Sequence, residues 1–189
     1  RMVLEEVRKN VGPWFPIIVR ISAEERVPGG NTLEDTLEYL EYIDEFIDMY
    51  DVSCGLNPSL QYQIDSNYLP DGWRSYMARA VKDKFKKPVI NAGNYRDPKV
   101  VEKILESGDV DIVGMGRGLI ADPNWVKKVE NSEEDIIRKC ISCNVGCAGN
   151  RIGVNRPIRC TVNPAVPEGD IYKALKVNKN CNVVVVGGG

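Results

Sequence analysis

Four of the six cysteines lie close together, in the pattern Cys140-x2-Cys143-x3-Cys147-x12-Cys160. Glycines and asparagines between them let the backbone turn tightly around a small ligand. Thiolates are soft ligands that select zinc, copper(I) or iron-sulfur clusters. A zinc ribbon usually shows two Cys-x2-Cys pairs, whereas this stretch has one pair, a third cysteine and a distant fourth. The spacing therefore favours a [4Fe-4S] cluster, with Zn2+ as the alternative.

Disulfides are the least favoured role for these cysteines. The sequence has no apolar signal segment and does not have the cysteine density of a small disulfide-bonded scaffold, so a reducing cytoplasm is the expected location. Cys54 lies in an apolar strand pattern and Cys181 begins another. Neither has a second cysteine nearby, and we expect both to be buried bystanders.

Composition limits the function classes. The 189 residues are 43% hydrophobic and 28% charged, as in ordinary globular proteins, and no stretch is long and apolar enough for a membrane span. The net charge of -2 gives no basic footprint for nucleic acid. Histidine is absent, so the commonest general base is missing, and cysteines, carboxylates, tyrosines or a bound cofactor must carry any chemistry.

The elements that position the cysteines alternate between strand and helix patterns. Thr32 and Asp35 have the spacing of a capping box, and Gly12 is placed to end a helix. Strands are expected at 16–21, 51–56, 88–92 and 111–116, and helices at 1–10, 33–50, 73–85, 98–106 and after Ala121. Four parallel βα units predict either a doubly wound sheet or a TIM barrel.

Glycines follow the last two of these strands. Gly93 and Asn94 come after one strand, and Gly116 and Arg117 come after the next. In TIM barrels the loops after strands seven and eight commonly hold a phosphate on backbone N–H groups, and Arg117 adds a bidentate cation. A tight turn is the alternative for each glycine alone, but two adjacent loops with an arginine favour a phosphate site.

The run from Asn182 to Gly189 joins four valines to three glycines. It predicts a buried strand that opens a G-x-G-x-x-G dinucleotide fingerprint, with Gly187 and Gly189 against a pyrophosphate. Only half of the fingerprint is present. A strand followed by a glycine turn has equal standing as an interpretation.

Three segments together resemble the multidomain branch of the old yellow enzyme family, the branch of 2,4-dienoyl-CoA reductase and related NADH:flavin oxidoreductases. They are Asp111–Pro123 with its Met-Gly-Arg core, Cys140–Cys147, and Arg159–Pro164. The resemblance covers nearly the whole chain. It implies the cofactors FMN, a [4Fe-4S] cluster, FAD and NAD(P)H.

The resemblance also implies a division of the chain. Residues 1–134 would be the C-terminal half of an FMN-binding (β/α)8 TIM barrel, 135–170 the cluster loop, and 171–189 a linker and the first strand of a Rossmann-like FAD or NAD(P)H domain. Arg20 falls where the family places a cation against the flavin, with a salt bridge as its alternative role. A half barrel leaves open edges and an uncovered inner face, so the chain alone is expected to self-associate and to be inactive.

Two departures from the family limit what the resemblance implies. Asn94 stands where 2,4-dienoyl-CoA reductase has an arginine beside the FMN phosphate, so that contact would be neutral and weaker. The histidine expected near Asn57 is also missing. Ser59, Tyr62 or Tyr68 could line the substrate pocket instead, but ordinary loop residues are the favoured interpretation for all three, and no catalytic residue is identified.

The expected function is an NAD(P)H-dependent reduction of an activated C=C bond in a small molecule. The alternatives are an amine dehydrogenase of the trimethylamine dehydrogenase type and, from another class, a zinc-stabilised binding module without redox chemistry. The expected partners are a small-molecule substrate and other copies of the chain, with no nucleic acid and no membrane.

Overall fold

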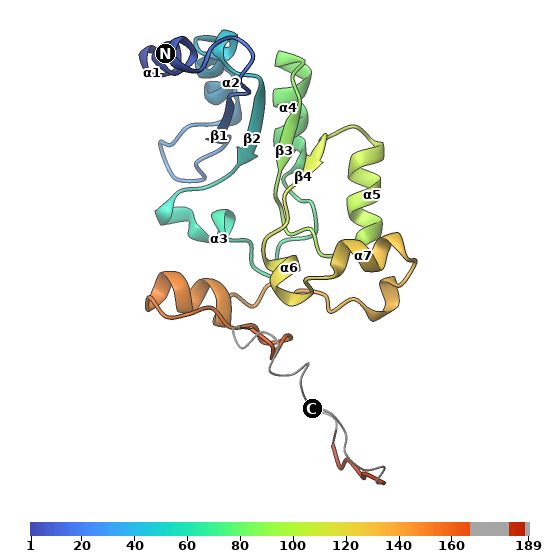
Figure 1. Ribbon diagram of the computed structural model, residues 1–189. Helices are drawn as coiled ribbons and strands as arrows, with labels where there is room; N and C mark the ends of the chain where they lie inside the picture. Colours follow the sequence, from blue (N-terminus) through green and yellow to red (C-terminus); the bar gives the residue numbers. More distant parts are fainter. Residues whose placement is uncertain (167–181, 188–189) are drawn as a thin grey trace.

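The computed structural model describes residues 1–166 and 182–187, and its centre is a sheet of four parallel strands. The strands lie in sequence order, as Figure 1 shows: β1 (Ile18–Ser22), β2 (Met49–Ser53), β3 (Val89–Asn91) and β4 (Ile112–Val113). A doubly wound sheet reverses its strand order at a switch point, whereas this order runs on without reversal, as in an arc of a TIM barrel. The α/β class with a parallel sheet agrees with the sequence analysis.

Helices precede the first strand, connect each strand to the next and follow the last one. The longer ones are α1 (Met2–Val11), α2 (Leu33–Glu41), α4 (Ser75–Phe85) and α5 (Pro98–Glu106). The shorter ones are α3 (Leu60–Gln63), α6 (Arg117–Ala121) and α7 (Trp125–Glu130), and a nine-residue π-helix, η4, spans Val145–Gly153. Single 3-10 turns occupy Asp44–Phe46, Asn57–Ser59 and Glu134–Ile136. None of the helices in the described residues is long and apolar enough to cross a membrane.

Local sequence signals account for several helix ends. The Thr32–Asp35 capping box is formed: Asp35 N–H donates to Thr32 Oγ1 at 3.3 Å, and Thr32 N–H donates to Asp35 Oδ2 at 2.8 Å. Asp97 caps α5, because its Oδ1 accepts from the N–H of Lys99 at 3.0 Å. Gly12 ends α1 with a φ of 82°, which a glycine adopts without strain.

The core lies between one face of the sheet and the helices. Tyr50 and Val52 of β2 are fully buried there, together with Leu40 of α2 and Met77 and Val81 of α4. On the opposite face Ile18 of β1 is 52% exposed and Ile112 of β4 is 45% exposed. One face of the sheet is therefore packed, while the other still presents apolar side chains.

A predicted helix and a predicted strand both extended further than the elements that the structure contains. The apolar spacing that predicted a helix as far as Tyr50 is interrupted, because α2 ends at Glu41 and Tyr50 belongs to β2. Tyr50 packs its ring 5.5 Å from that of Phe85 and donates its hydroxyl to Asp44 at 2.7 Å, and these tertiary contacts override the helical period. The strand expected at 111–116 is also shorter, because β4 spans only Ile112–Val113.

The buried strand expected at 182–186 is not present. Residues 182–187 contain no strand, and Val183 and Val186 are 74% and 95% exposed. A lone extended segment leaves its backbone groups without ladder partners, so valine propensity alone does not make a strand. Gly187 has a φ of 84°, which is consistent with a turn. Cys181 and Gly189 lie outside the described residues.

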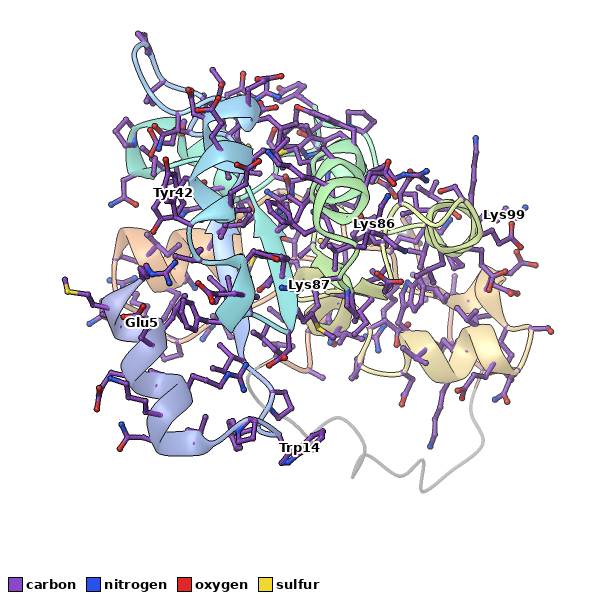
Figure 2. The ribbon with its side chains drawn as sticks, turned by 90° about the horizontal axis from the view of Figure 1, so that it is seen from above. Glu5, Trp14, Tyr42, Lys86, Lys87 and Lys99 are labelled. Atoms are coloured by element: carbon purple, nitrogen blue, oxygen red, sulfur yellow. The ribbon has the colours of Figure 1, made fainter. Side chains whose placement is uncertain are left out.

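The ends of the sheet differ in what surrounds them. In Figure 1, α1 lies at the upper end, while α3, α6 and the π-helix lie beyond the lower end, where the strands have their carboxyl ends. Figure 2 looks down on the molecule from above and shows Trp14 at the periphery, after α1, and Lys99 projecting from the outer side of α5. The carboxyl end of the sheet is where parallel α/β proteins place their ligands.

Candidate functional site

A cavity of about 350 Å³ opens at the carboxyl ends of the strands. Five predicted cofactor residues lie around it, from three separate parts of the chain. They are Arg20, Gly93, Asn94, Gly116 and Arg117. The π-helix adds Ala148 and Ile152 to its wall. Residues that the sequence analysis chose for flavin binding are thus brought together in one place.

Arg20 lines the cavity and also forms a salt bridge. Its Nη1 donates to Asp51 Oδ2 at 2.8 Å and its Nη2 donates to Ser53 Oγ at 3.2 Å. The strand register places Arg20 directly opposite Asp51, so the pairing follows from the sheet itself. The salt bridge expected as an alternative is therefore present, and it holds a guanidinium on the cavity wall.

Asn94 joins two loops. Its Nδ2 donates to the carbonyls of Ser66 and Leu69 at 3.1 and 2.8 Å, and its Oδ1 accepts from Ser142 Oγ at 2.5 Å. It adopts a φ of 57°, a left-handed conformation that asparagine tolerates. Because the amide is occupied in this way, the side chain connects the loop after β2 to the cysteine stretch.

Gly93 allows a close approach of the backbone to a buried arginine. A Cβ at this position would lie 2.9 Å from Cγ of Arg74. Arg74 itself is almost fully buried and donates from Nε to the carbonyl of Ala92 at 2.5 Å and from Nη1 to that of Tyr62 at 2.8 Å. Burial lowers the pKa of the Arg74 guanidinium, and the nearby Asp65 carboxylate opposes that shift.

The buried carboxylate of Asp65 was not predicted from the sequence. Trp73 Nε1 donates to its Oδ1 at 2.8 Å, and Arg74 and Arg117 form ion pairs with its Oδ2 at 3.3 and 3.5 Å. A single acid in an irregular loop has no motif that would have revealed it. Its placement depends on the folding of the long loop after β2.

All four predicted cluster ligands line a second, smaller cavity. It lies next to the first and is lined by Cys140, Cys143, Cys147 and Cys160, with Arg117 and Ile120 between the two. Each of the five cysteines that the structure describes is a free thiol. Figure 1 shows this stretch beyond the lower end of the sheet, below α6.

Gly146 brings the distant fourth cysteine to the other three. Arg159 N–H donates to the Gly146 carbonyl at 2.6 Å, and a Cβ on Gly146 would lie 2.6 Å from the carbonyl oxygen of Arg159. Only glycine permits this approach, which holds Cys160, the next residue, beside the loop of Cys143 and Cys147. The role of this glycine was visible in the sequence only as general turn propensity.

Cys143 lies in a polar turn between two residues in left-handed conformation, Ser142 and Asn144, with φ of 48° and 59°. Burial alone would raise the pKa of the Cys143 thiol. Hydrogen bonds from the Thr161 hydroxyl and from backbone N–H groups, including that of Val145, outweigh burial and lower that pKa. The turn therefore favours the thiolate, which is the form that binds metal.

The four thiols line one common cavity. In residues 1–166 and 182–187, no group of three or more His, Cys, Asp or Glu side chains is arranged to hold one metal ion. Zinc requires each sulfur about 2.3 Å from one point, whereas a [4Fe-4S] cluster presents separate iron atoms to the thiolates. Soft thiolate ligands suit either group.

The other residues considered in the loop after β2 do not line the larger cavity in the described part of the chain. Ser59 is buried and donates to the Glu25 carbonyl at 2.6 Å, the Tyr62 ring lies 5.9 Å from that of Trp73 in a tilted arrangement, and Tyr68 is 90% exposed. A role in a substrate pocket, which was the less favoured interpretation of these three residues, finds no support in this geometry. Cys54 is fully buried, as expected, and burial raises the pKa of its thiol.

Comparison with known proteins identifies the class. The model of the NADH:flavin oxidoreductase / NADH oxidase family matches residues 1–135. An NADH oxidase from Thermoanaerobacter brockii is 41% identical over 191 aligned positions, which cover 99% of this chain and 29% of that protein. The chain therefore belongs to the NADH:flavin oxidoreductase / NADH oxidase family, whose members are flavin-dependent oxidoreductases.

Solved structures agree with this membership. A 2-naphthoyl-CoA reductase in complex with 2-naphthoyl-CoA matches with a TM-score of 0.79 and 30% identity, over 87% of this chain and 25% of that one. Histamine dehydrogenase from Rhizobium sp. 4-9 matches with a TM-score of 0.76 and 27% identity, over 87% and 24%. The fold is similar to that of TIM-barrel flavoenzymes, and the chain spans about a quarter of each of these structures.

Proposed function

We propose that this chain is the part of a larger NAD(P)H-dependent flavin oxidoreductase that holds FMN beside a [4Fe-4S] cluster. The observation that carries the proposal is the contact between the two cavities, which share Arg117, Ile120, Cys140 and Cys147 in their walls. A flavin in the larger cavity and a cluster in the smaller one would be separated by little more than these side chains. Such closeness suits electron transfer between them.

We propose that the chain consists of three parts, each associated with a different cofactor. Residues 1–134 form the C-terminal half of an FMN barrel, 135–170 carry the cluster, and 171–189 lead into a domain for FAD or NAD(P)H, with Gly187 and Gly189 at its start. The family match to residues 1–135 and the unreversed order of four strands support the first part. The relatives are three to four times as long as this chain, which leaves room for the remaining parts.

The residues present fit these cofactors. Arg117 and the backbone at Gly93 and Gly116 would hold the FMN phosphate, and Arg20 would place positive charge beside the flavin ring. Cys140, Cys143, Cys147 and Cys160 would supply the four thiolates. When bound, FMN supplies two-electron chemistry and the cluster supplies one-electron transfer.

For the reaction, we propose the reduction of an activated C=C bond in a small molecule such as an enoate or enoyl thioester. The likeness to a 2-naphthoyl-CoA reductase supports this direction of electron flow. The alternative is an amine dehydrogenase that passes electrons the other way, and the likeness to histamine dehydrogenase supports it. Membership in a flavin oxidoreductase family sets aside a binding module without redox chemistry.

The test uses the complete polypeptide purified without oxygen. We expect a visible spectrum with flavin maxima and a broad brown absorbance, FMN released on denaturation, and about four iron and four sulfide per chain. Stoichiometric zinc without iron or sulfide, or the absence of flavin, would contradict the proposal. Oxidation of NAD(P)H with an enoate or enoyl thioester, compared with reduction of a dye by amines, then distinguishes the two reactions.

A further inference from the structure

We propose that Asp65 is a positioning residue that holds the Arg117 guanidinium between the two cavities, so that a phosphate in the larger cavity stabilises the cysteine stretch. The inference rests on the proposed function, because it places FMN in one cavity and the cluster in the other. It adds a physical link between the two sites. That link is a short chain of hydrogen bonds through a buried carboxylate, an arginine and an asparagine.

The first part of the link is the Asp65 carboxylate, which is 2% exposed. Trp73 and Arg74 fix its orientation, with donors 2.8 and 3.3 Å from its oxygens. Arg117 approaches the same residue twice, with Nη2 3.5 Å from Oδ2 and Nη1 2.5 Å from the backbone carbonyl. A planar guanidinium held at two points has little freedom to rotate.

The second part of the link runs from Arg117 to the cysteines. Arg117 Nη1 donates to Asn144 Oδ1 at 2.5 Å, and Asn144 Nδ2 donates back to the carbonyls of Ile64 and Asp65, at 3.3 Å each. Asn144 directly follows Cys143 and precedes the π-helix that contains Cys147. The position of Arg117 therefore sets the position of the turn that carries these two thiols.

Charge explains why an anion would tighten this arrangement. Arg74 and Arg117 bring two positive charges to the single negative charge of Asp65, and all three are largely buried. By contrast, Arg96 and Arg20, which also line the larger cavity, are each paired with a carboxylate of their own, Asp71 and Asp51. A phosphate beside Arg117 would balance the excess charge and reduce the freedom of its guanidinium.

The test compares FMN with riboflavin, which has the same ring but no phosphate. The complete polypeptide, stripped of flavin but retaining its cluster, is loaded with each flavin, and iron release to a chelator is timed without oxygen. In the wild-type protein we expect FMN to slow iron release about fivefold more than riboflavin does, the scale of a typical coupling between sites. In Asp65→Asn we expect the two flavins to protect the cluster equally.

Two further variants keep the result interpretable. Arg117→Lys keeps the positive charge, but a lysine cannot donate to Asp65, Asn144 and a phosphate from one planar group. In this variant, too, FMN and riboflavin should slow iron release equally. Asp71→Asn removes a carboxylate from another arginine pair beside the same cavity. In this variant FMN should still slow iron release more than riboflavin does. A merely structural role for Asp65 predicts equal weakening with both flavins, not the loss of the phosphate-specific effect.

The outcomes separate this inference from the function it rests on. Equal protection by FMN and riboflavin in the wild-type protein, or an undiminished difference in Asp65→Asn and Arg117→Lys, would overturn the inference while FMN and cluster content still support the proposed function. A wild-type protein that contains no flavin or no iron would overturn both. Dissociation constants for FMN and riboflavin, measured on the same samples, show whether each flavin is bound during the assay.

Discussion

The thiol of Cys143 is surrounded by hydrogen-bond donors, whereas that of Cys54 is enclosed by the apolar core. The pKa of Cys143 is lowered by Thr161 and nearby backbone N–H groups against the effect of burial, and the pKa of Cys54 is raised by burial. Two cysteines in one chain thus differ in how readily they become thiolates. A ligand and a bystander are expected to differ in this way.

This contrast leads to a prediction about iron content. Replacing any one of the four cysteines around the smaller cavity with serine should lower the iron content and weaken the brown absorbance of the complete polypeptide, because serine is a poor ligand for iron-sulfur clusters. Cys54→Ala should leave both unchanged. Iron analysis and visible absorption under anaerobic conditions measure the effect, and full iron content in the Cys143→Ser variant would remove that residue from the cluster.

Asp122 provides a second prediction, concerning stability and pH. Its carboxylate is fully buried and accepts from Lys128 Nζ at 2.6 Å and from the N–H of Arg138 at 3.0 Å, which fixes the segment leading to Cys140. Burial alone would raise the pKa of Asp122, but these bonds lower it below its ordinary value. A depressed pKa means that the stabilisation is present above about pH 4 and is lost as the pH falls through the folded-state value.

We expect Asp122→Asn to lower the free energy of unfolding by about 2 kcal/mol near neutral pH. The variant should also lose less stability than the wild-type protein between about pH 4 and pH 2. Urea unfolding across this range measures both effects. Asp83→Asn is the control, because Asp83 pairs with Arg79 on an exposed face and should change stability little. Equal pH dependence in the wild-type and Asp122→Asn proteins would contradict the argument.

At the scale of single residues, the role of a side chain could be predicted where the residue belonged to a recognisable sequence pattern. The cysteine spacing and the two glycine loops indicated residues that do lie around two adjoining cavities. Asp65, Arg74 and Asn144 belong to no such pattern. Their positions follow from how the loop after β2 packs against the cysteine stretch, which is a tertiary property.

Among the elements, the π-helix and the irregular segment that leads from it to Cys160 depend on a single close contact. A Cβ on Gly146 would meet the Arg159 backbone at 2.6 Å, whereas one on Gly153, in the same helix, would meet nothing within 4 Å. The backbone carbonyl cannot swing aside as a flexible side chain could. The two glycines therefore form a matched pair for testing how the fourth cysteine is held.

Gly146→Ala should displace Cys160 from the other three cysteines and lower the iron content of the complete polypeptide, whereas Gly153→Ala should not. The expected change is a faster loss of iron to a chelator, by about tenfold, the scale of a disturbed metal shell. Timed chelator assays on both variants supply the comparison. If both alanine variants retain iron as the wild-type protein does, the contact between Gly146 and Arg159 has no part in holding the cluster.

The boundaries of helices and strands show where local sequence signals are sufficient to predict the structure. The bounds of α5 were predicted correctly at Pro98–Glu106, because Asp97 caps the helix and proline fixes its first turn. The helix predicted to continue to Tyr50 ends earlier, because Ile43 and Ile47 flank a 3-10 turn and Tyr50 lies in β2, and these residues match the helical period only by chance. The valines at 183–186 failed for a different reason. A strand needs neighbouring strands, and sequence propensity cannot supply them.

For the molecule as a whole, the two faces of the sheet are unequal. One face carries the packed core, while Ile18 and Ile112 on the other are about half exposed. Trp14 is 93% exposed at the opposite end from the cavities and lies at the periphery in Figure 2. Apolar side chains exposed on a sheet face promote association more than a single exposed aromatic does, because a facing copy of the chain can cover several of them at once.

The last prediction concerns this chain expressed alone. Because one face of its parallel sheet is uncovered, we expect it to form dimers or larger species at micromolar concentration in sedimentation velocity experiments. The double variant Ile18→Lys/Ile112→Lys places two lysines on that face. It should shift the population toward monomer, because burying the charges in a contact is unfavourable. Trp14→Lys serves as the control and should leave association largely unchanged. A compact wild-type monomer would instead mean that the exposed face is stable in water, which would count against the half-barrel assignment and favour a complete small α/β domain.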